Sequence, residues 1–336
     1  MSLRVVVATT VLAAVVCASP ARAHHLPPPN PSQSDPYFHC LNDGTDNADA
    51  TPWFNNNYNA SWALSPSLLD RHIPQGLTTW ESYYGAGNDL LVYTAYSQSD
   101  GRARIQGIDP RDGSKTNFAQ LQAGTHAGGV AIVGRWAFVP GANAGGVRRY
   151  SLSRLADIFA RGPSSDALEG TYAGDVVGTG FMTQAGNTIY AGTFNPNGLG
   201  VMRTYSVDAD GDLHATSGNI EVPKKTQGLL VLPDYFVFST SQGRTNRSNV
   251  YVVERGYSSL ARSYNNGNLR CVRIPTMSEG VAFTGGRIYQ LFESGADCYR
   301  YNEPECRGDG TPDRVITRLH RIPRVTLIDD LPVYRG

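Results

Sequence analysis

Lysine is nearly absent from this sequence of 336 residues: the 29 basic residues include three Lys, and the remainder are Arg. The acidic residues also number 29, so the formal net charge is zero and no positive field would attract nucleic acid. Charged residues make up only 17% and hydrophobic residues 40%, which excludes a disordered chain and a coiled coil. Beyond residue 18 no apolar run is long enough to cross a bilayer, so we expect no membrane span.

Sequence motifs that mark several enzyme classes are also missing. The chain has no GxSxG, HExxH or P-loop pattern and no GxGxxG before a helix. No CxxC pair occurs either. In the acid-rich segment from Asp208 to Asp212, Gly211 stands at position 4, whereas a calcium-binding EF-hand loop needs Gly at position 6, and position 12 is Asn219 instead of an acid. We therefore interpret the segment as a hairpin turn. The sequence therefore predicts no cofactor and no metal site, and it contains no decisive catalytic motif.

Residues 1–23 have the pattern of a secretory signal peptide. Arg4 supplies the positive charge, and the 14 residues from Val5 to Ala18 are apolar but too few to span a membrane. Ala21-Arg22-Ala23 forms a small-x-small cleavage site, so the mature chain would start at His24. We therefore expect a secreted, extracellular protein. The scarcity of Lys and the Ala-rich leader are typical of a GC-rich bacterial genome.

Four cysteines remain once the leader, which contains Cys17, is removed: Cys40, Cys271, Cys298 and Cys306. Four Cys in an exported protein indicate two disulfides, which can be paired in three ways. Cys298 and Cys306 are separated by a short loop. If they pair with each other, Cys40 pairs with Cys271 and ties the N-terminal segment to the body of the protein.

Five segments share a Gly, three or four mostly apolar residues, a tight turn and a second β-type run. The repeated Gly falls at positions 76, 129, 180, 228 and 280, with spacings of 53, 51, 48 and 52. A sheet unit of about 50 residues fits a four-stranded propeller blade, and neighbouring blades bury each other's faces. A β-sandwich does not account for the regular period, and a β-helix needs a shorter one. We therefore predict an all-β, five-bladed β-propeller in which the repeated Gly opens each innermost strand, where backbones crowd together.

Residues 24–60 are rich in Pro, Asn, Asp and His and show no periodicity. We therefore assign residues 24–69 to an extended N-terminal arm and residues 70–336 to a single propeller domain. Long amphipathic patterns are missing, and the best helical candidate is a short segment around Ser153 to Ala160.

Closing the ring requires the last blade to be completed by a strand from the other end of the chain. We expect residues 314–322 or 324–329 to pair with chain from about residues 57–68.

The residues just before the repeated Gly are the candidates for a ligand site, because propeller ligands bind where the innermost strands converge. Gln75, Thr179, Gln227 and Glu279 are predicted to line this axial site. An alternative is that these polar groups hydrogen-bond one another and plug the channel.

Glu279 is the leading candidate for acid–base chemistry, because a carboxylate desolvated at the axis has a raised pKa. His126 is a candidate partner that would orient or shuttle a proton; the alternative is a channel-facing His that bonds a backbone carbonyl. Glu81 and Glu293 are further acids near the blade mouths. Two carboxylates across the axis would allow glycoside hydrolysis.

Parts of the repeats resemble the five-bladed propeller glutaminyl cyclases of plants and bacteria. The resemblance extends in scattered pieces over about a third of the repeat region, and three segments show it most clearly: Gln75-Gly76-Leu77, Glu279-Gly280-Val281 and Tyr289-Gln290-Leu291. In that family the EG segment follows in the next blade, whereas here it lies four blades later, and Phe292 replaces the expected Trp. The resemblance implies a propeller fold with Glu279 as the proton-transferring acid. The run from His126 to Gly129, with Ser278-Glu279-Gly280, is also similar to secreted actinobacterial propellers.

Three classes of function follow from these observations. The first is a binding protein whose axial mouth holds a small polar ligand, such as a sugar or a peptide end. The second is an enzyme, either a hydrolase that uses Glu279 with another acid or an acyl transferase. The third is an extracellular interaction protein that uses a blade face. The polar residues differ between blades, which favours one asymmetric site over a multivalent lectin, and we expect a monomer that binds no nucleic acid.

Overall fold

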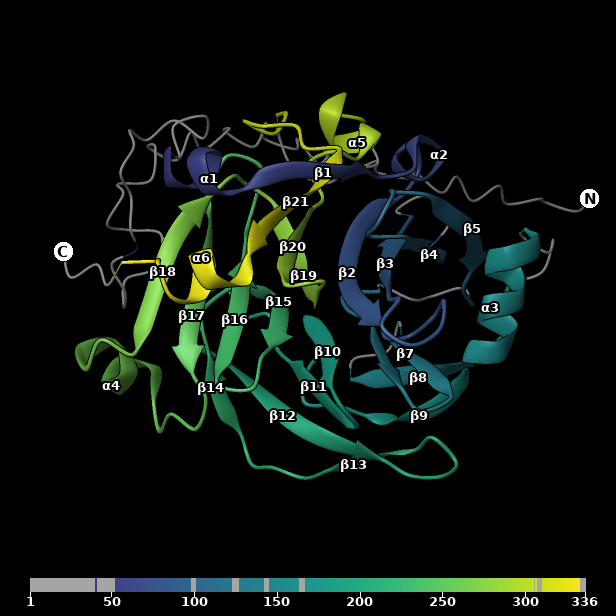
Figure 1. Cartoon of the computed structure of the whole chain (residues 1–336), viewed down its shortest axis with the longest axis horizontal. Helices are drawn as coiled ribbons and strands as arrows, with labels where there is room; N and C mark the ends of the chain where they lie inside the picture. Colours follow the sequence, from purple (N-terminus) through teal and green to yellow (C-terminus); the bar gives the residue numbers. More distant parts are fainter. Residues whose placement is uncertain are drawn as a thin grey trace, which may run out of the picture.

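Five antiparallel β-sheets are arranged in a ring around a central axis (Figure 1). The computed structural model describes residues 40, 52–97, 101–122, 127–141, 145–162, 167–304, 306 and 310–332. The predicted leader, the segment 24–51 apart from Cys40, and His126 lie outside these residues. The arrangement confirms the all-β, five-bladed β-propeller that the spacing of the repeated Gly predicts.

Four of the blades are built from consecutive strands that run from the axis outward. Blade 1 contains β2 (Ile73–Trp80), β3 (Leu90–Tyr96), β4 (Ala103–Ile108) and β5 (Lys115–Gln120). Blade 2 contains β6 (Ala131–Val133), β7 (Trp136–Pro140), β8 (Gly146–Ser151) and β9 (Thr171–Asp175). Blade 3 contains β10 (Phe181–Ala185), β11 (Thr188–Gly192) and β12 (Gly200–Val207), and its outer edge is split between β13 (Leu213–Ala215) and β14 (Ile220–Val222). Blade 4 contains β15 (Thr226–Val231), β16 (Tyr235–Thr240), β17 (Ser248–Glu254) and β18 (Leu269–Ile274).

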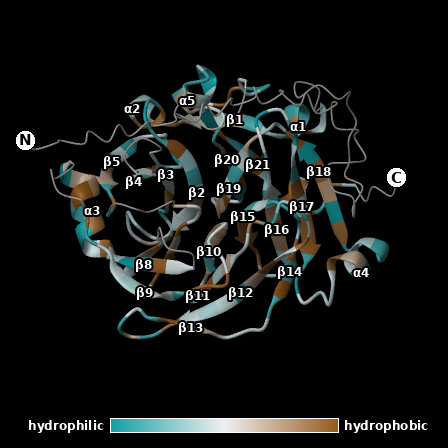
Figure 2. Cartoon of the chain, turned by 180° about the vertical axis from the view of Figure 1, so that it is seen from behind, coloured by the Kyte–Doolittle hydropathy of each residue, from teal (hydrophilic) through white to brown (hydrophobic). Residues whose placement is uncertain are grey.

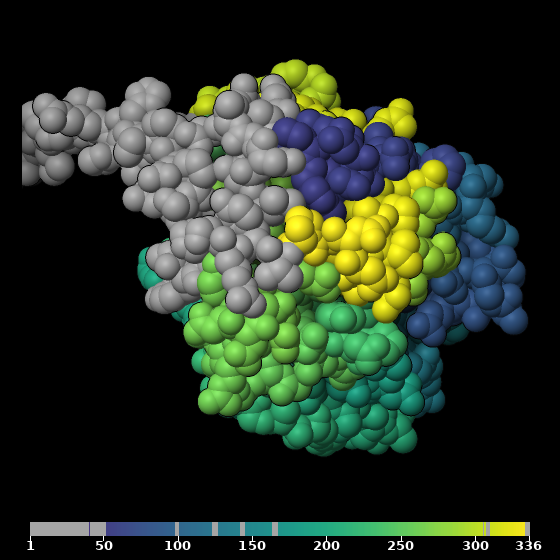
Figure 3. Space-filling view, turned by 60° about the vertical axis from the view of Figure 1, so that its left-hand side comes forward, coloured from purple at the N-terminus to yellow at the C-terminus, as the bar shows by residue number. Residues whose placement is uncertain are grey.

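The fifth blade joins the two ends of the described chain. It contains β19 (Ser278–Thr284), β20 (Arg287–Phe292) and β21 (Arg318–Pro323), and β1 (Asn59–Ala63) supplies its outermost strand. β1 pairs antiparallel with β21, with Ala60 opposite His320. The early residues that include β1 (purple) therefore lie against the late residues that include β21 (yellow) (Figure 3). This confirms the predicted closure of the ring by the segments 57–68 and 314–322.

Middle strands of the blades are covered on both faces by the neighbouring blades. β3 and β17 are buried along almost their whole length, and their sequences are mostly apolar. The outermost β5 alternates between exposed and more buried positions, because one of its faces meets water. Figure 2 shows this mixture of hydrophobic and hydrophilic residues along the strands.

The hydrophobic core is divided into five main clusters, one at each interface between neighbouring blades. Each cluster joins side chains from two blades, for example Leu90 and Val139, Phe138 and Ile189, Phe181 and Phe238, Val250 and Phe292, and Tyr289 and Leu91. A single blade could not bury both of its faces, so the stability of the fold depends on ring closure.

The repeated Gly lies where the innermost strands approach one another most closely. A Cβ atom at Gly76 would lie 2.6 Å from the backbone carbon of Gly129 in the next blade. A Cβ at Gly228 would collide with the backbone of Glu279, and one at Gly280 with the backbone nitrogen of Leu77. A side chain at these positions would hold neighbouring blades apart, as the sequence pattern predicts.

We expect Gly280→Ala to lower the free energy of unfolding by about 1–3 kcal/mol, because overpacking must push two backbones apart. Urea unfolding of the purified protein measures this loss. Gly218→Ala is the matched control, since a Cβ at Gly218 meets no atom within 4 Å. Equal stabilities of the two variants would contradict close packing at the axis.

Short helices lie outside the ring of sheets. α3 (Leu152–Arg161) covers the predicted helical segment and buries Leu152, Leu155 and Phe159. The others are α1 (Pro52–Asn57), α2 (Pro66–Leu69), α4 (Leu260–Asn265), α5 (Asp297–Arg300) and α6 (Arg324–Ile328). None of the helices in the described ranges is long and apolar enough to cross a membrane.

The last part of the predicted arm, residues 52–69, is folded onto blade 5. Residues 52–69 form α1, β1 and α2, and Phe54 and Leu68 are buried against the sheets. These apolar side chains depart from the polar composition of the segment, and their burial stabilises its packing on the blade.

Of the three possible pairings of the four cysteines, the structure has the one in which Cys298 and Cys306, separated by a short loop, are bonded to each other. Cys40 is bonded to Cys271 on β18, and this bond spans 231 residues of sequence. Cys298 on α5 is bonded to Cys306, eight residues later. The first bond ties the arm to blade 4, and the second closes a loop beside the axis.

Candidate functional site

Three innermost strands are irregular at the same end of the channel. The pairing register shifts at Gln75 in β2, at Gln227 in β15 and at Glu279 in β19. A bulge of this kind interrupts the alternation of side chains and redirects one of them. The irregularities therefore bring polar residues of three blades to the channel together.

The backbone just before two of these residues is strained. Lys225 and Met277 each precede the polar residue by two positions, and both have a φ of 63°. This left-handed conformation is unfavourable for residues with a Cβ and is found most often where function requires it. Hydrogen bonds hold both positions: the carbonyl of Met277 accepts from the N–H of Glu293 at 3.0 Å, and that of Lys225 from the N–H of Ser241 at 3.0 Å.

A cavity of about 750 Å³ opens at this end of the channel, which we call the axial mouth. Glycine backbone forms much of its wall, and polar and aromatic side chains contribute the remainder: Gln75, Tyr96, Thr179, Thr193, Phe194, Gln227, Glu293 and Tyr299. Three of the four predicted ligand-binding residues, Gln75, Thr179 and Gln227, therefore line one cavity. The fourth, Glu279, lies behind Gln227.

Two carboxyl groups from blade 5 meet at the axial mouth. Strands β19 and β20 are antiparallel, and Ser278 at the start of β19 lies opposite Phe292 at the end of β20. Glu293, the residue after β20, therefore lies at the same end of the channel as Glu279. Gln227 donates through Nε2 to Oε1 of Glu279 at 3.1 Å, and Gln75 donates through Nε2 to Oε2 of Glu293 at 3.0 Å. Glu279 is only 1% exposed, and its Oε2 has no hydrogen-bond partner among the described residues.

The protonation of this pair is shifted strongly from normal. Burial, followed by the negative charge of Glu293, raises the pKa of Glu279 well above its usual range, against the hydrogen bond from Gln227. Burial also raises the pKa of Glu293 to about 7, against hydrogen bonds from Gln75 and Tyr299 and the charge of Arg244. Both carboxyl groups are therefore harder to ionise than an exposed Glu.

A short cap beside the mouth, residues 294–304 with Cys306, holds Tyr299 at the pair. The hydroxyl of Tyr299 donates to Oε2 of Glu293 at 3.5 Å, and the ring packs with Cys298 and Cys306 in a small cluster. Arg244, from the loop between β16 and β17, fixes the cap: its Nη2 donates to the carbonyl of Cys306 at 2.9 Å, and its guanidinium lies 4.9 Å from the Tyr299 ring centroid. Burial raises the pKa of the Tyr299 hydroxyl, so it stays a neutral donor.

We expect Tyr299→Phe to raise the pKa of Glu293 further, by about half a pH unit, because the ionised carboxylate loses one donor. Carboxyl ¹³C NMR titration measures this change. Tyr301→Phe is the control, since Tyr301 lies on the same segment but is 64% exposed. A titration midpoint of Glu293 that is unchanged in Tyr299→Phe would show that the hydroxyl does not act on the carboxylate.

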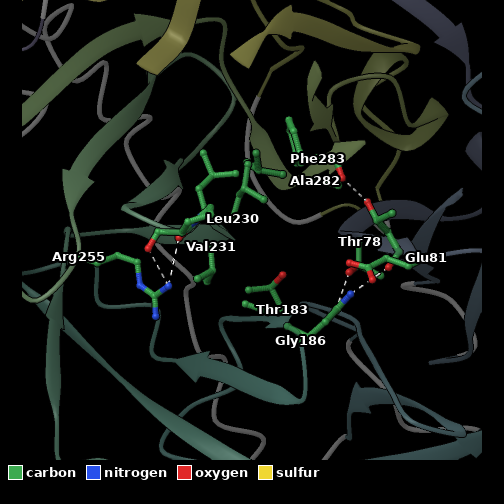
Figure 4. A pocket seen from close by; sticks show the side chains of 15 residues that line it. Thr78, Glu81, Thr183, Gly186, Leu230, Val231, Arg255, Ala282 and Phe283 are labelled. Atoms are coloured by element: carbon green, nitrogen blue, oxygen red, sulfur yellow. Dashed lines mark hydrogen bonds between the residues drawn. The ribbon is translucent and has the colours of Figure 1, made fainter. Parts of the chain in front are cut away.

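The opposite end of the channel has a separate cavity of about 340 Å³, which we call the far mouth (Figure 4). Glu81 and Arg255 lie on opposite sides of it, with Thr183 between them. Glu81 follows β2, six residues after Gln75, and an extended strand of this length spans roughly 20 Å. Glu81 therefore belongs to a different cavity and is not part of the Glu279–Glu293 pair.

Gln184 ties three blades together at the far end. Its Oε1 accepts from the hydroxyl of Thr78 at 2.7 Å and from the N–H of Ile132 at 3.0 Å. Its Nε2 donates to the carbonyl of Thr79 at 3.0 Å. Gln184 thus forms a polar link across the far end of the channel, in addition to the bonds that Gln75 and Gln227 make to Glu293 and Glu279 at the axial mouth.

Tyr96 and Tyr299 are two of the residues of the axial mouth that the repeat pattern does not indicate. Tyr299 directly follows Cys298 in the disulfide loop, which is the signal that could have directed attention to it. Tyr96 ends β3, so it reaches the same end of the channel as the start of β2. Tyr96 is placed by the return of a second strand and Tyr299 by the cap, and the repeated Gly marks neither.

The described ranges contain no group of three or more His, Cys, Asp or Glu side chains that could hold a metal ion. The hairpin turn from Asp208 to Asp212 is held by its own bonds, with Oδ1 of Asp208 accepting from three backbone N–H groups. The side chain of Asp208 also pairs with His214 at 2.8 Å.

No family model matches this chain, and no curated protein matches it. Among solved structures it is similar to hydrazine synthase from Kuenenia stuttgartiensis, at 12% identity and a TM-score of 0.37, with 68% of this chain and 58% of that chain covered. It is also similar to two proteins provisionally named 6-phosphogluconolactonase. The Bacteroides uniformis protein has 15% identity, a TM-score of 0.32, and 58% of each chain covered. The Bacteroides fragilis protein has 11% identity, a TM-score of 0.34, and 59% of this chain and 58% of that chain covered. The chain thus matches 58% of the length of these proteins, and likeness at this level says nothing of activity.

Proposed function

We propose that this chain is a secreted protein that holds a small polar ligand in the axial mouth and exchanges a proton with it through Glu279 and Glu293. One observation carries this proposal: two buried carboxyl groups meet beside a cavity, and Oε2 of Glu279 has no partner among the described residues. A buried polar atom left without a hydrogen bond costs about 1–3 kcal/mol. A proton or a ligand at this oxygen would remove that cost.

The size and lining of the axial mouth support a ligand of the size of a sugar or a peptide end. Its volume of about 750 Å³ lies within the range of small-molecule sites. The amide of Gln227 offers a donor and an acceptor, whereas that of Gln75 offers its oxygen, because its two N–H bonds already go to Pro74 and Glu293. The rings of Phe194 and Tyr299 offer flat apolar surfaces. The predicted leader and the two disulfides support an extracellular location.

The protonation states support acid–base chemistry rather than binding alone. A general acid or base works best when its pKa lies near the operating pH, and the pKa of Glu293 is raised to about 7. The pKa of Glu279 is raised as well, so the site holds two carboxyl groups that ionise less readily than an exposed Glu. Two such groups, one acting as acid and the other as base, would suit a hydrolase or an acyl transferase.

A purely structural role is the second candidate, because the same side chains join blades. The bond from Gln227 to Glu279 links blade 4 to blade 5, and the bond from Gln75 to Glu293 links blade 1 to blade 5. In that case the pair would stabilise the ring of an extracellular interaction protein and would bind no ligand.

A thermal-shift screen separates the two candidates. The probes are glucose, cellobiose, glucosamine, N-acetylglucosamine and short peptides with N-terminal Gln. A ligand present at about 100 times its Kd adds about 2.7 kcal/mol of stability. We expect such a gain in the wild type, its loss in Glu279→Gln and in Gln227→Ala, and its retention in Glu81→Gln, which changes only the far mouth. A gain that survives Glu279→Gln, or no gain with any probe, would contradict a ligand site at the pair.

A further inference from the structure

The charges around the carboxyl pair are unbalanced. The residues that line the axial mouth include Glu293 but no Lys, Arg or His within the described part of the chain. The cation nearest to the pair is Arg244, which is buried and already engaged with the cap. Its Nη1 donates to Oδ1 of Asn302 at 2.7 Å, and its Nη2 donates to the carbonyl of Cys306 at 2.9 Å. The described lining therefore brings no positive charge to the cavity, and a ligand could supply one.

The acceptors of the pair suit a group with several N–H donors. Oε2 of Glu279 has no partner among the described residues. Both donors to Glu293, from Gln75 and Tyr299, use its Oε2, which leaves Oε1 for a ligand. An ammonium group carries up to three N–H bonds and a positive charge, so it can satisfy an oxygen of each carboxylate at once.

The aromatic lining favours the same kind of group. Tyr96, Phe194 and Tyr299 all line the axial mouth, and ring faces attract cations. An anionic ligand would be repelled by the pair. A neutral sugar would form hydrogen bonds but would leave the charge of the carboxylates uncompensated in a desolvated site.

We propose that the axial mouth selects ligands that carry a primary or secondary ammonium group, which lies between Glu279 and Glu293 and displaces a proton from the pair. This inference rests on the proposed function, because it names the chemical class of the ligand for the same site. The groups that face the pair are Gln75 and Gln227, the hydroxyls of Tyr96 and Tyr299, and the engaged Arg244.

Matched probes test this inference by isothermal titration calorimetry at neutral pH. Each pair differs only in the amine: glucosamine against glucose, and alanine amide against N-acetylalanine amide. We expect at least one amine to bind about tenfold or more tighter than its neutral twin, as one restored charge pair would give. We also expect proton release, seen as a binding enthalpy that differs between phosphate and Tris buffers. Glu293→Gln should abolish both effects, and Glu81→Gln should change neither.

A smaller probe makes the test independent of ligand shape. Ethylammonium chloride should lower the pH at which the pair titrates, measured by carboxyl ¹³C NMR against sodium chloride at equal ionic strength. No change with ethylammonium, or equal binding of both members of the matched pairs, overturns the ammonium inference. The proposed function then stands if a neutral probe gains stability that Glu279→Gln removes. A larger change with calcium chloride than with ethylammonium also overturns the inference, because the pair would then bind a metal ion.

Discussion

Replacing both acids of the pair, in Glu279→Gln/Glu293→Gln, is expected to stabilise the protein by roughly 2–3 kcal/mol more at about pH 8 than at about pH 5. Burial raises the pKa of Glu293 from 4.5 to about 7, and that of Glu279 in the same direction. Between these values the folded protein binds more protons than the unfolded chain. Stability is therefore lost as the pH rises through the folded-state pKa, and Gln, which cannot ionise, does not incur this loss.

The difference between variant and wild type isolates the pair from other titrating groups. His320 is buried between Phe54 and Phe292, and burial lowers its pKa from 6.5 to about 4. Its effect has the opposite sign, since stability due to His320 rises with pH between those two values, and it is present in both proteins. Chemical denaturation at several pH values measures the difference. Parallel stability curves for the two proteins would mean that the carboxyl groups titrate normally.

Removing the long disulfide, in Cys40→Ser/Cys271→Ser, is expected to lower the free energy of unfolding by up to about 5 kcal/mol. The bond spans 231 residues, so it restricts nearly the whole unfolded chain. It also ties the arm to β18, next to the blade that β1 completes. Guanidinium unfolding under non-reducing conditions measures the loss.

The short disulfide provides the control for this prediction. Its residues are only eight apart, so Cys298→Ser/Cys306→Ser should cost about half as much, roughly 2.5 kcal/mol. It should also disturb the axial mouth, because Tyr299 lies beside Cys298 in the cap. Equal losses from the two double variants would contradict the role of the long bond in closing the ring.

Most of the fold could be predicted from the sequence because one structural requirement recurs in every blade. The Gly positions 76, 129, 180, 228 and 280 have to be Gly, since neighbouring backbones leave no room for a Cβ at the axis. Their spacing therefore reveals both the number of blades and the strand that opens each one. The arm was harder to predict, because its polar composition hides the few apolar side chains, such as Phe54, that pack on blade 5.

The candidate site could be predicted in part. The polar residues before the repeated Gly were found because they share a position in the repeat. The separation of Glu81 from Glu293 depends on strand direction: Glu81 follows an innermost strand, whereas Glu293 follows a second strand that returns to the axial mouth. The composition of the chain and the spacing of the repeated Gly do not show in which direction each strand runs along the channel. The role of His126 stays a prediction, and Tyr299 is placed by packing of the cap, which no repeat encodes.

The most direct test of the central claim is a carboxyl ¹³C NMR titration of the wild-type protein with labelled Glu side chains. We expect two coupled resonances that titrate far above the usual range, one of them near pH 7, with one lost in Glu279→Gln and the other in Glu293→Gln. Their midpoints should move when a ligand binds in the axial mouth. If every Glu titrates near its ordinary pKa, the pair holds no proton at neutral pH, and the proposed acid–base site at the axis is wrong.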